Sequence, residues 1–333
     1  MPSASDVLRA NREQALDYSA KAGQARLAKL LAAAAKELEA KLKGIKPGGG
    51  GTYTEAQVKA TLASIRAITG KVGNGVKDAT VSNAETIAPM AAAGTIRYLK
   101  DLDKKFRGLG QQPLALDEAA AMDVAKEGAR ASVLRRLVEG VPDEQGKTKT
   151  KVGILERYGQ AVVGHFEDQM RIGLVTRRPW DEMRQSLIDK SPFLQGAPAH
   201  WAERIVRTET MGAHARASLE TMKHADDELG DMLKVLCATF DDRTGSDSIS
   251  VHGQIRRTRE FFDTWQGKVM VPPARPNDRE IVVPHRMSWP MPANLLPRSD
   301  AEVHARWKAE KRKGSPPPRP RLSTVAIAPS GKR

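Results

Sequence analysis

The stretch from Trp201 to Thr210 reads WAERIVRTET, and the stretch from Leu233 to Phe240 reads LKVLCATF. In the first stretch Glu203 and Arg207 are four residues apart, a spacing at which helical side chains pair. The second is a short apolar run bounded by turn-forming residues, which is typical of a strand. A long helix that leads into strands predicts a small α+β module in this part of the chain.

The sequence around these two stretches extends the prediction in both directions. Two further strand-like runs follow at residues 268–271 and 280–283. Upstream, residues 154–223 have a helical pattern that is interrupted at Pro179, at Ser191-Pro192 and at residues 196–198.

The first half of the chain is expected to be helical. Apolar side chains at helical spacing predict one amphipathic helix, or two, over residues 5–45. This segment either packs on a neighbouring helix or forms a coiled-coil or partner-binding arm, and we assign residues 1–46 to it. Further helices are expected from Thr54 to a stop at Gly70, and over residues 84–107 and 117–139. The Gly-rich residues 47–52 are predicted to be a linker, and residues 53–150 a helical region.

The charge balance of the 333-residue chain favours an anionic partner. Lys and Arg number 54 against 40 Asp and Glu, which gives a net charge of +14. Half of the surplus falls in residues 301–333, where nine Lys and Arg face two Glu. We predict that residues 291–333 form an extended, Pro-rich basic tail. The residues expected to bind nucleic acid or a protein partner are Lys308, Lys311, Arg312, Lys313, Arg319 and Arg321.

Several classes of protein are disfavoured by what the sequence lacks. The single cysteine, Cys237, excludes an internal disulfide framework and a cysteine-based zinc site, and it is expected to be a small buried hydrophobe. No apolar run is long enough for a membrane span, and the N-terminus has no visible secretory signal.

The sequence shows no complete catalytic motif. The run Gly146-Lys147-Thr148 lacks the glycine that a phosphate-binding loop needs five residues before it. The seven histidines form no helical zinc motif, although His252 and His285 flank the predicted strands and could meet in space. We therefore expect a protein without enzymatic activity, cofactor or metal.

The motifs of the α+β module occur in a recognisable order. The helix carries RIVRTE at residues 204–209, and the turn after the first strand carries Asp241, Arg243 and Thr244. The module closes with the run Asn277-Asp278-Arg279-Glu280. In this order the motifs resemble those of the phage Mu F-like minor head protein family, also called the phage head morphogenesis domain. The resemblance covers roughly residues 151–290.

The chain departs from that family at the cysteines. Where many members carry cysteines, this sequence has Gly245 and Ser248, and Asp278 and Glu280 in the closing run. We therefore expect a salt-bridged version of the same turn instead of a thiolate metal site. The expected structural polar cluster consists of Arg204, Arg207, Thr208, Glu209, Asp241, Arg243, Thr244, Asp278 and Arg279.

The resemblance implies a minor head protein of a tailed phage or prophage, associated with the portal or inner capsid. Such a protein acts in head morphogenesis and in DNA packaging or ejection. Its implied partners are the portal protein, the major capsid protein and packaged DNA, with several copies per particle and no contact with membrane. Its implied location is the virion, reached from the host cytoplasm during assembly.

Two other classes of function stay open at this point. One is a free-standing protein that binds nucleic acid or acts on the host. The other is a toxin-type enzyme built on the same module, which would be expected to carry an added catalytic domain.

Overall fold

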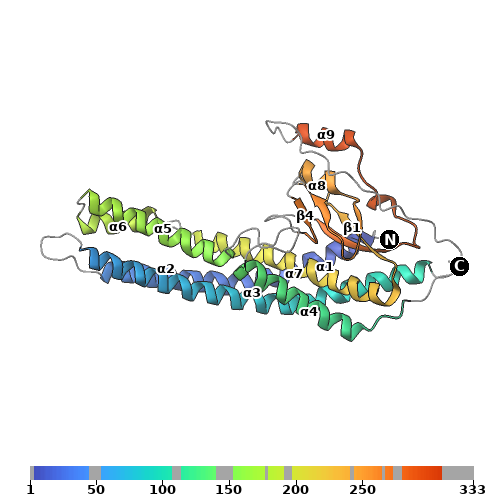
Figure 1. The fold of residues 1–333 in the computed structure, drawn as a ribbon, viewed down its shortest axis with the longest axis horizontal. Coiled ribbons are helices and arrows are strands. Elements are labelled where there is room, and N and C mark those ends of the chain that lie inside the picture. The colour runs from blue at the N-terminus through green and yellow to red at the C-terminus, as the bar shows by residue number, and fades with distance from the viewer. Residues whose placement is uncertain are drawn as a thin grey trace.

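The computed structural model of the chain describes residues 4–44, 54–106, 114–139, 153–176, 179–190, 197–240, 244–264, 267–272 and 280–309. These residues form an elongated helical bundle with a small β region at one end (Figure 1). The chain is therefore mostly helical with a few strands, as the α+β prediction requires at this coarse level. The Gly-rich residues 47–52 and the loop at 140–150 lie outside the described residues.

The N-terminal half supplies the long axis of the bundle. The expected helix over residues 5–45 is present as two helices joined by a π-helical turn, η1. The longest helix, α3, has 52 residues and spans about 78 Å at 1.5 Å per residue. The elements of this half are α1 (Ala4–Ser19), η1 (Ala20–Gln24), α2 (Ala25–Gly44), α3 (Glu55–Phe106), α4 (Glu118–Leu134) and the π-helical turn η2 (Arg135–Glu139).

The predicted helix stop at Gly70 is wrong, because α3 continues through Gly70, Gly73 and Gly75 to Phe106. An interior glycine costs a helix about 1 kcal/mol relative to alanine. The apolar spacing, however, continues across the glycines from Ile68 to Val76, and these side chains are buried. Packing of this face outweighs the local propensity.

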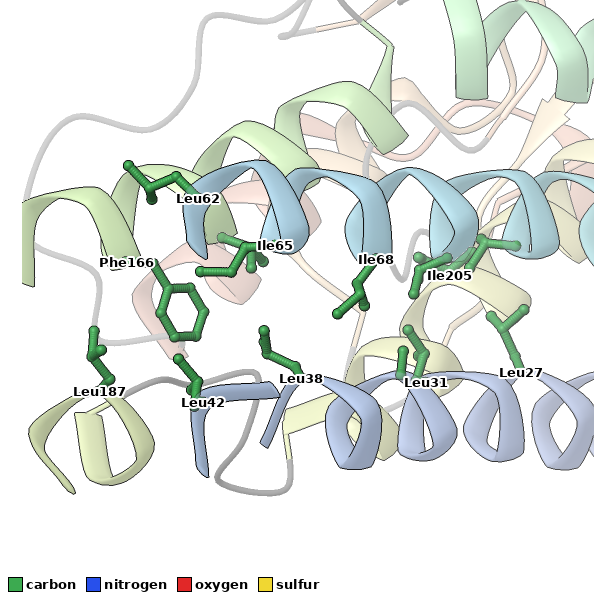
Figure 2. Close-up of a cluster of buried hydrophobic side chains, with 14 of the residues drawn as sticks. Leu27, Leu31, Leu38, Leu42, Leu62, Ile65, Ile68, Phe166, Leu187 and Ile205 are labelled. Carbon is green, nitrogen blue, oxygen red and sulfur yellow. The ribbon is translucent and has the colours of Figure 1, made fainter. Parts of the chain in front are cut away.

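The breaks predicted between residues 154 and 223 are confirmed. Helix α5 (Ile154–Val175) ends before Pro179, α6 (Trp180–Lys190) ends before Pro192, and α7 (Ala197–Leu229) follows. Leucine, isoleucine and valine side chains from α2, α3 and α7 pack with Phe166 of α5 and Leu187 of α6 (Figure 2). This core joins the two halves of the sequence.

Helices α3, α4 and α7 meet through short side chains. The buried contact surface consists largely of alanines, four from α3, two from α4 and two from α7: Ala84, Ala88, Ala91, Ala92, Ala125, Ala129, Ala213 and Ala217. Gly128 of α4 faces Glu220 of α7 so closely that an added Cβ would lie 2.4 Å from the Glu220 Cγ. The many short side chains at this junction allow the helix backbones to approach closely.

The β region begins directly after α7, where Gly230 adopts a φ of +71°. Its three-stranded sheet is antiparallel, in the order β2-β1-β5. The strands predicted at 233–240, 268–271 and 280–283 are present as β1 (Met232–Cys237), β4 (Gly267–Val269) and β5 (Ile281–Arg286). Strands β2 (Ile255–Arg257) and β3 (Phe262–Thr264) were not predicted, because each has only one apolar residue and so forms no apolar run.

The sheet is covered on both sides. Val235 and Cys237 of β1 pack with Tyr98 and Leu99 of α3 and with Leu8 of α1. On the other side, Leu236 of β1 packs with neighbours from α7, α8 (Ser246–Val251), β3 and β5: Met222, Val251, Phe262 and Val282. Burial of Cys237, which is 1% exposed, is confirmed.

The C-terminal segment corrects the prediction of an extended tail from residue 291. Residues 293–295 form the 3-10 turn η3 (Ala293–Leu295), and residues 300–309 form α9 (Asp300–Ala309). Leu295 and Val303 are buried, and Arg306 Nε donates to the Thr244 carbonyl oxygen at 2.8 Å. The segment therefore docks on the β region, because it has apolar side chains to bury there. Residues 310–333 lie outside the described residues.

Candidate functional site in the buried polar residues of α7 and the sheet

Helix α7 carries polar side chains into the interior of the bundle. Thr208, Glu209, Thr210 and His214 are all buried, since α7 packs against α3 and α4 along much of its length. Buried polar groups need hydrogen-bond partners within the protein, or ordered water, to offset the loss of bulk solvent. The partners of these residues are therefore informative.

The ion-pair partner of Glu209 comes from η2. The Glu209 carboxyl is 2% exposed, and its Oε1 lies 3.3 Å from Nη2 of Arg136. Burial raises the pKa of Glu209, while the guanidinium of Arg136 opposes that rise. At the next residue of α7, Thr210 Oγ1 accepts a hydrogen bond from Asn83 Nδ2 of α3 at 2.9 Å. The motif is thus fixed to the bundle by residues of the first half of the chain.

The predicted polar cluster is only partly within the described residues. Arg207, Thr208 and Glu209 lie on α7, and for Arg204 only its place on that helix is described. Thr244 lies in the β region, where its hydroxyl donates to the Thr239 carbonyl oxygen. The remaining predicted members, Asp241, Arg243, Asp278 and Arg279, lie outside the described residues.

No ion pair or hydrogen bond joins the described side chains of this cluster to one another. The Nε of Arg207 and Oγ1 of Thr208 are buried without a hydrogen-bond partner. Arg136 and Asn83 were missed by the sequence analysis, since nothing in their local pattern distinguishes them from other polar residues on a helix. Their role depends on contacts between segments far apart in the chain.

Helix α1 binds the sheet through two arginines that were also missed. Arg9 Nη2 donates to the Ala238 carbonyl oxygen at 2.7 Å and lies 3.3 Å from the Cys237 sulfur. Arg12 is 4% exposed and donates to the Glu280 carbonyl oxygen at 3.5 Å and to the Glu13 carboxylate at 2.9 Å. Burial raises the pKa of the Cys237 thiol despite the neighbouring Arg9, so this thiol is not an activated nucleophile.

Lys234, in the middle of β1, is the most deeply buried cationic side chain of the β region. It is 0% exposed, and its Nζ donates to the Met270 carbonyl oxygen at 2.8 Å and lies over the Phe262 ring at 4.7 Å. No carboxylate among the described residues forms an ion pair with it. Burial, aided by the cations Lys223 and Arg216, lowers the pKa of Lys234 to about 7.

The two histidines beside the strands hold the backbone in place. His252 Nδ1 accepts from the Ala238 N–H at 3.1 Å, and its Nε2 lies 3.1 Å from the Asn294 carbonyl oxygen. Burial and Arg298 lower the pKa of His252 to about 4, so the ring is neutral at pH 7. His285 Nε2 lies 3.2 Å from the Trp289 carbonyl oxygen, and burial lowers its pKa as well. The sequence had left open a meeting of these histidines in space, but each pairs with backbone instead.

The polar side chains described above hold helices, strands and turns together. Across the described ranges, no three His, Cys, Asp or Glu residues are grouped so that they could bind a metal ion. Within the same ranges, no helix is both long and apolar enough to cross a membrane. The titratable groups named above lie in helix junctions and in or beside the sheet, where they contact neighbouring elements.

The pairing of Glu209 with Arg136 gives a prediction for stability. Glu209→Ala should lower the free energy of unfolding by about 2–4 kcal/mol, because it leaves a partly buried guanidinium without its carboxylate. In a double-mutant cycle with Arg136→Ala, urea denaturation should give a coupling energy of about 1–3 kcal/mol. Additive effects of the two substitutions would contradict the pairing.

Lys234 gives a prediction for pH dependence. In the folded chain its pKa is about 7, below the ordinary value of 10.5, so the unfolded chain binds the extra proton between these values. Stability should therefore rise with pH by about 1.4 kcal/mol per pH unit from pH 7 towards pH 10. Lys234→Met, of similar length and uncharged, should unfold at a higher temperature at pH 7 and lose this slope. Thermal unfolding of both proteins across the pH range measures this, and equal slopes would refute it.

Comparison with known proteins found no match: no protein-family model, no curated protein and no solved structure matches this chain. The fold and the site geometry are therefore described from this structure alone. They describe a mostly helical chain with a small antiparallel sheet, in which buried polar residues join segments that are distant in the sequence.

Proposed function

We propose that this chain is a minor head protein of a tailed phage or prophage, associated with the portal or the inner capsid and acting in head morphogenesis. The observation that carries the proposal is the order of motifs from RIVRTE at residues 204–209, through the turn at 241–244, to the closing run at 277–280. This order resembles that of the phage Mu F-like minor head proteins, and it implies their function.

The geometry of the described residues is compatible with a structural role. The helix that carries RIVRTE continues directly into a buried strand, and its polar side chains are engaged in holding elements together. Arg9 and Arg12 tie the N-terminal helix to the same sheet. An elongated bundle that presents a small β region at one end is a suitable scaffold for contacts with other proteins (Figure 1).

The proposed partners are the portal or major capsid protein and packaged DNA. Lys308 is exposed on α9, and residues 310–333 add seven Lys and Arg against one Glu. Side chains of this kind displace counterions from phosphates and give affinity without sequence readout. Helix α9, which carries Lys308, contacts the β region through Arg306 and Thr244.

The proposal predicts that the chain is a component of phage particles. Particles purified on a density gradient from the strain that encodes it should contain the chain in several copies, as measured by quantitative mass spectrometry. A non-structural protein of the same phage serves as the control for contamination. Absence from the particles, with the chain abundant in the cell lysate, would refute the proposal and favour a free-standing nucleic-acid-binding or host-directed protein.

A second prediction concerns the basic tail, residues 310–333. Deletion from residue 310 keeps Val303 and Arg306 in place, so the fold should be unchanged. The truncated protein should bind DNA more weakly, and the slope of log K against log salt should fall by about 0.9 for each lost phosphate contact. A full-length variant with glutamine at the five basic positions between residues 311 and 321 controls for chain length. If both variants bind DNA with the affinity and salt slope of the parent, the tail is not a DNA contact.

A further inference from the structure

A small cavity lies where α1, α7 and β5 meet. The volume open to the centre of a water molecule is about 20 Å³. Its polar lining comes from three separate parts of the chain, with Arg12 from α1, His214 and Ser218 from α7, and Glu280 before β5. Apolar side chains such as Leu8 and Ile281 complete the wall.

His214 contributes a ring nitrogen to this site that needs a hydrogen-bond partner. It is 6% exposed, and its Nε2 is buried with no hydrogen-bond partner among the protein atoms. Burial, together with the neighbouring Arg12, lowers the pKa of His214 to about 3, so the imidazole is neutral at pH 7. A neutral imidazole nitrogen still requires a donor or an acceptor, and native interiors meet such needs with ordered water.

The size and charge of the cavity identify the ligand. One water molecule needs roughly 10–15 Å³ of this volume, so about 20 Å³ holds one water and excludes organic molecules. The lining carries one cationic and one anionic side chain, Arg12 and Glu280, which favours a neutral dipolar ligand over an ion. The surrounding hydroxyl, guanidinium and carboxyl groups offer both donors and acceptors.

We infer that this cavity is a binding site for a single structural water molecule, which hydrogen-bonds to Nε2 of His214 and connects α7 to α1 and β5. The water is a fixed part of the joint between the N-terminal helix and the sheet. It supplements the direct bond from Arg12 to the Glu280 carbonyl oxygen. The inference does not depend on the proposed function.

A substitution that fills the cavity with methyl groups tests whether a water molecule is bound there. Ala215 lines the cavity, and Ala215→Val would place two methyl groups in it. If water is bound, the substitution expels it and leaves His214 Nε2 without a partner, so the melting temperature should fall by several degrees. If the cavity is dry, the added methyl groups fill a void and break no hydrogen bond, so this fall in melting temperature is not expected.

The matched background is His214→Leu, which removes the polar atom at nearly constant volume. Comparing Ala215→Val in the parent and in this background cancels the helix propensity of valine. The water site predicts a clearly larger fall in melting temperature in the parent, and equal shifts in both backgrounds would overturn it.

A direct measurement on the unmodified protein keeps the test independent of the variants. A crystal structure at high resolution should show density in the cavity at 2.7–3.2 Å from His214 Nε2, the range of a hydrogen bond. Absence of density there, with well-ordered surrounding side chains, would overturn the inference.

Discussion

The close packing of α7 against α3 and α4 is the constraint on which the rest of the structure depends. Alanines at the contact surface bring the three helices together, and Gly128 leaves room for Glu220. A helix buried along so much of its length cannot direct all its polar side chains to solvent. Thr208, Glu209, Thr210 and His214 are therefore interior residues, and their partners must come from other elements or from water.

The same constraint explains how the two halves of the chain are joined. Asn83 and Arg136 reach α7 from the N-terminal half, and Arg9 and Arg12 reach the sheet from α1. Each contact links residues more than 70 positions apart. Charged and amide side chains at such junctions specify one arrangement of helices, whereas an interface of alanines alone tolerates sliding.

The β region shows how buried titratable groups serve a small sheet. Lys234 and His252 lie at its centre and its edge, and both have a lowered pKa because burial disfavours their charged forms. His252 connects the end of β1 to the C-terminal segment through Ala238 and Asn294. Gly253 beside it adopts a φ of +79° and lies so close to Pro297 that a side chain would meet the backbone. The close approach of the C-terminal segment at Pro297 therefore requires glycine at this turn.

The sequence by itself determined that most of the chain is helical, that prolines interrupt it before α6 and α7, and where three of the strands lie. These features follow from local apolar spacing and turn residues. It also placed Glu209 on a helix of the module. Only the tertiary structure decided that α3 continues through Gly70, because burial of Ile68 and Val76 outweighs the propensity of the glycines. Only the structure decided that residues 300–309 dock as a helix and that Arg136 pairs with Glu209. The physical reason is the same in each case: burial and ion pairing depend on which distant segments meet, and a local pattern does not record that.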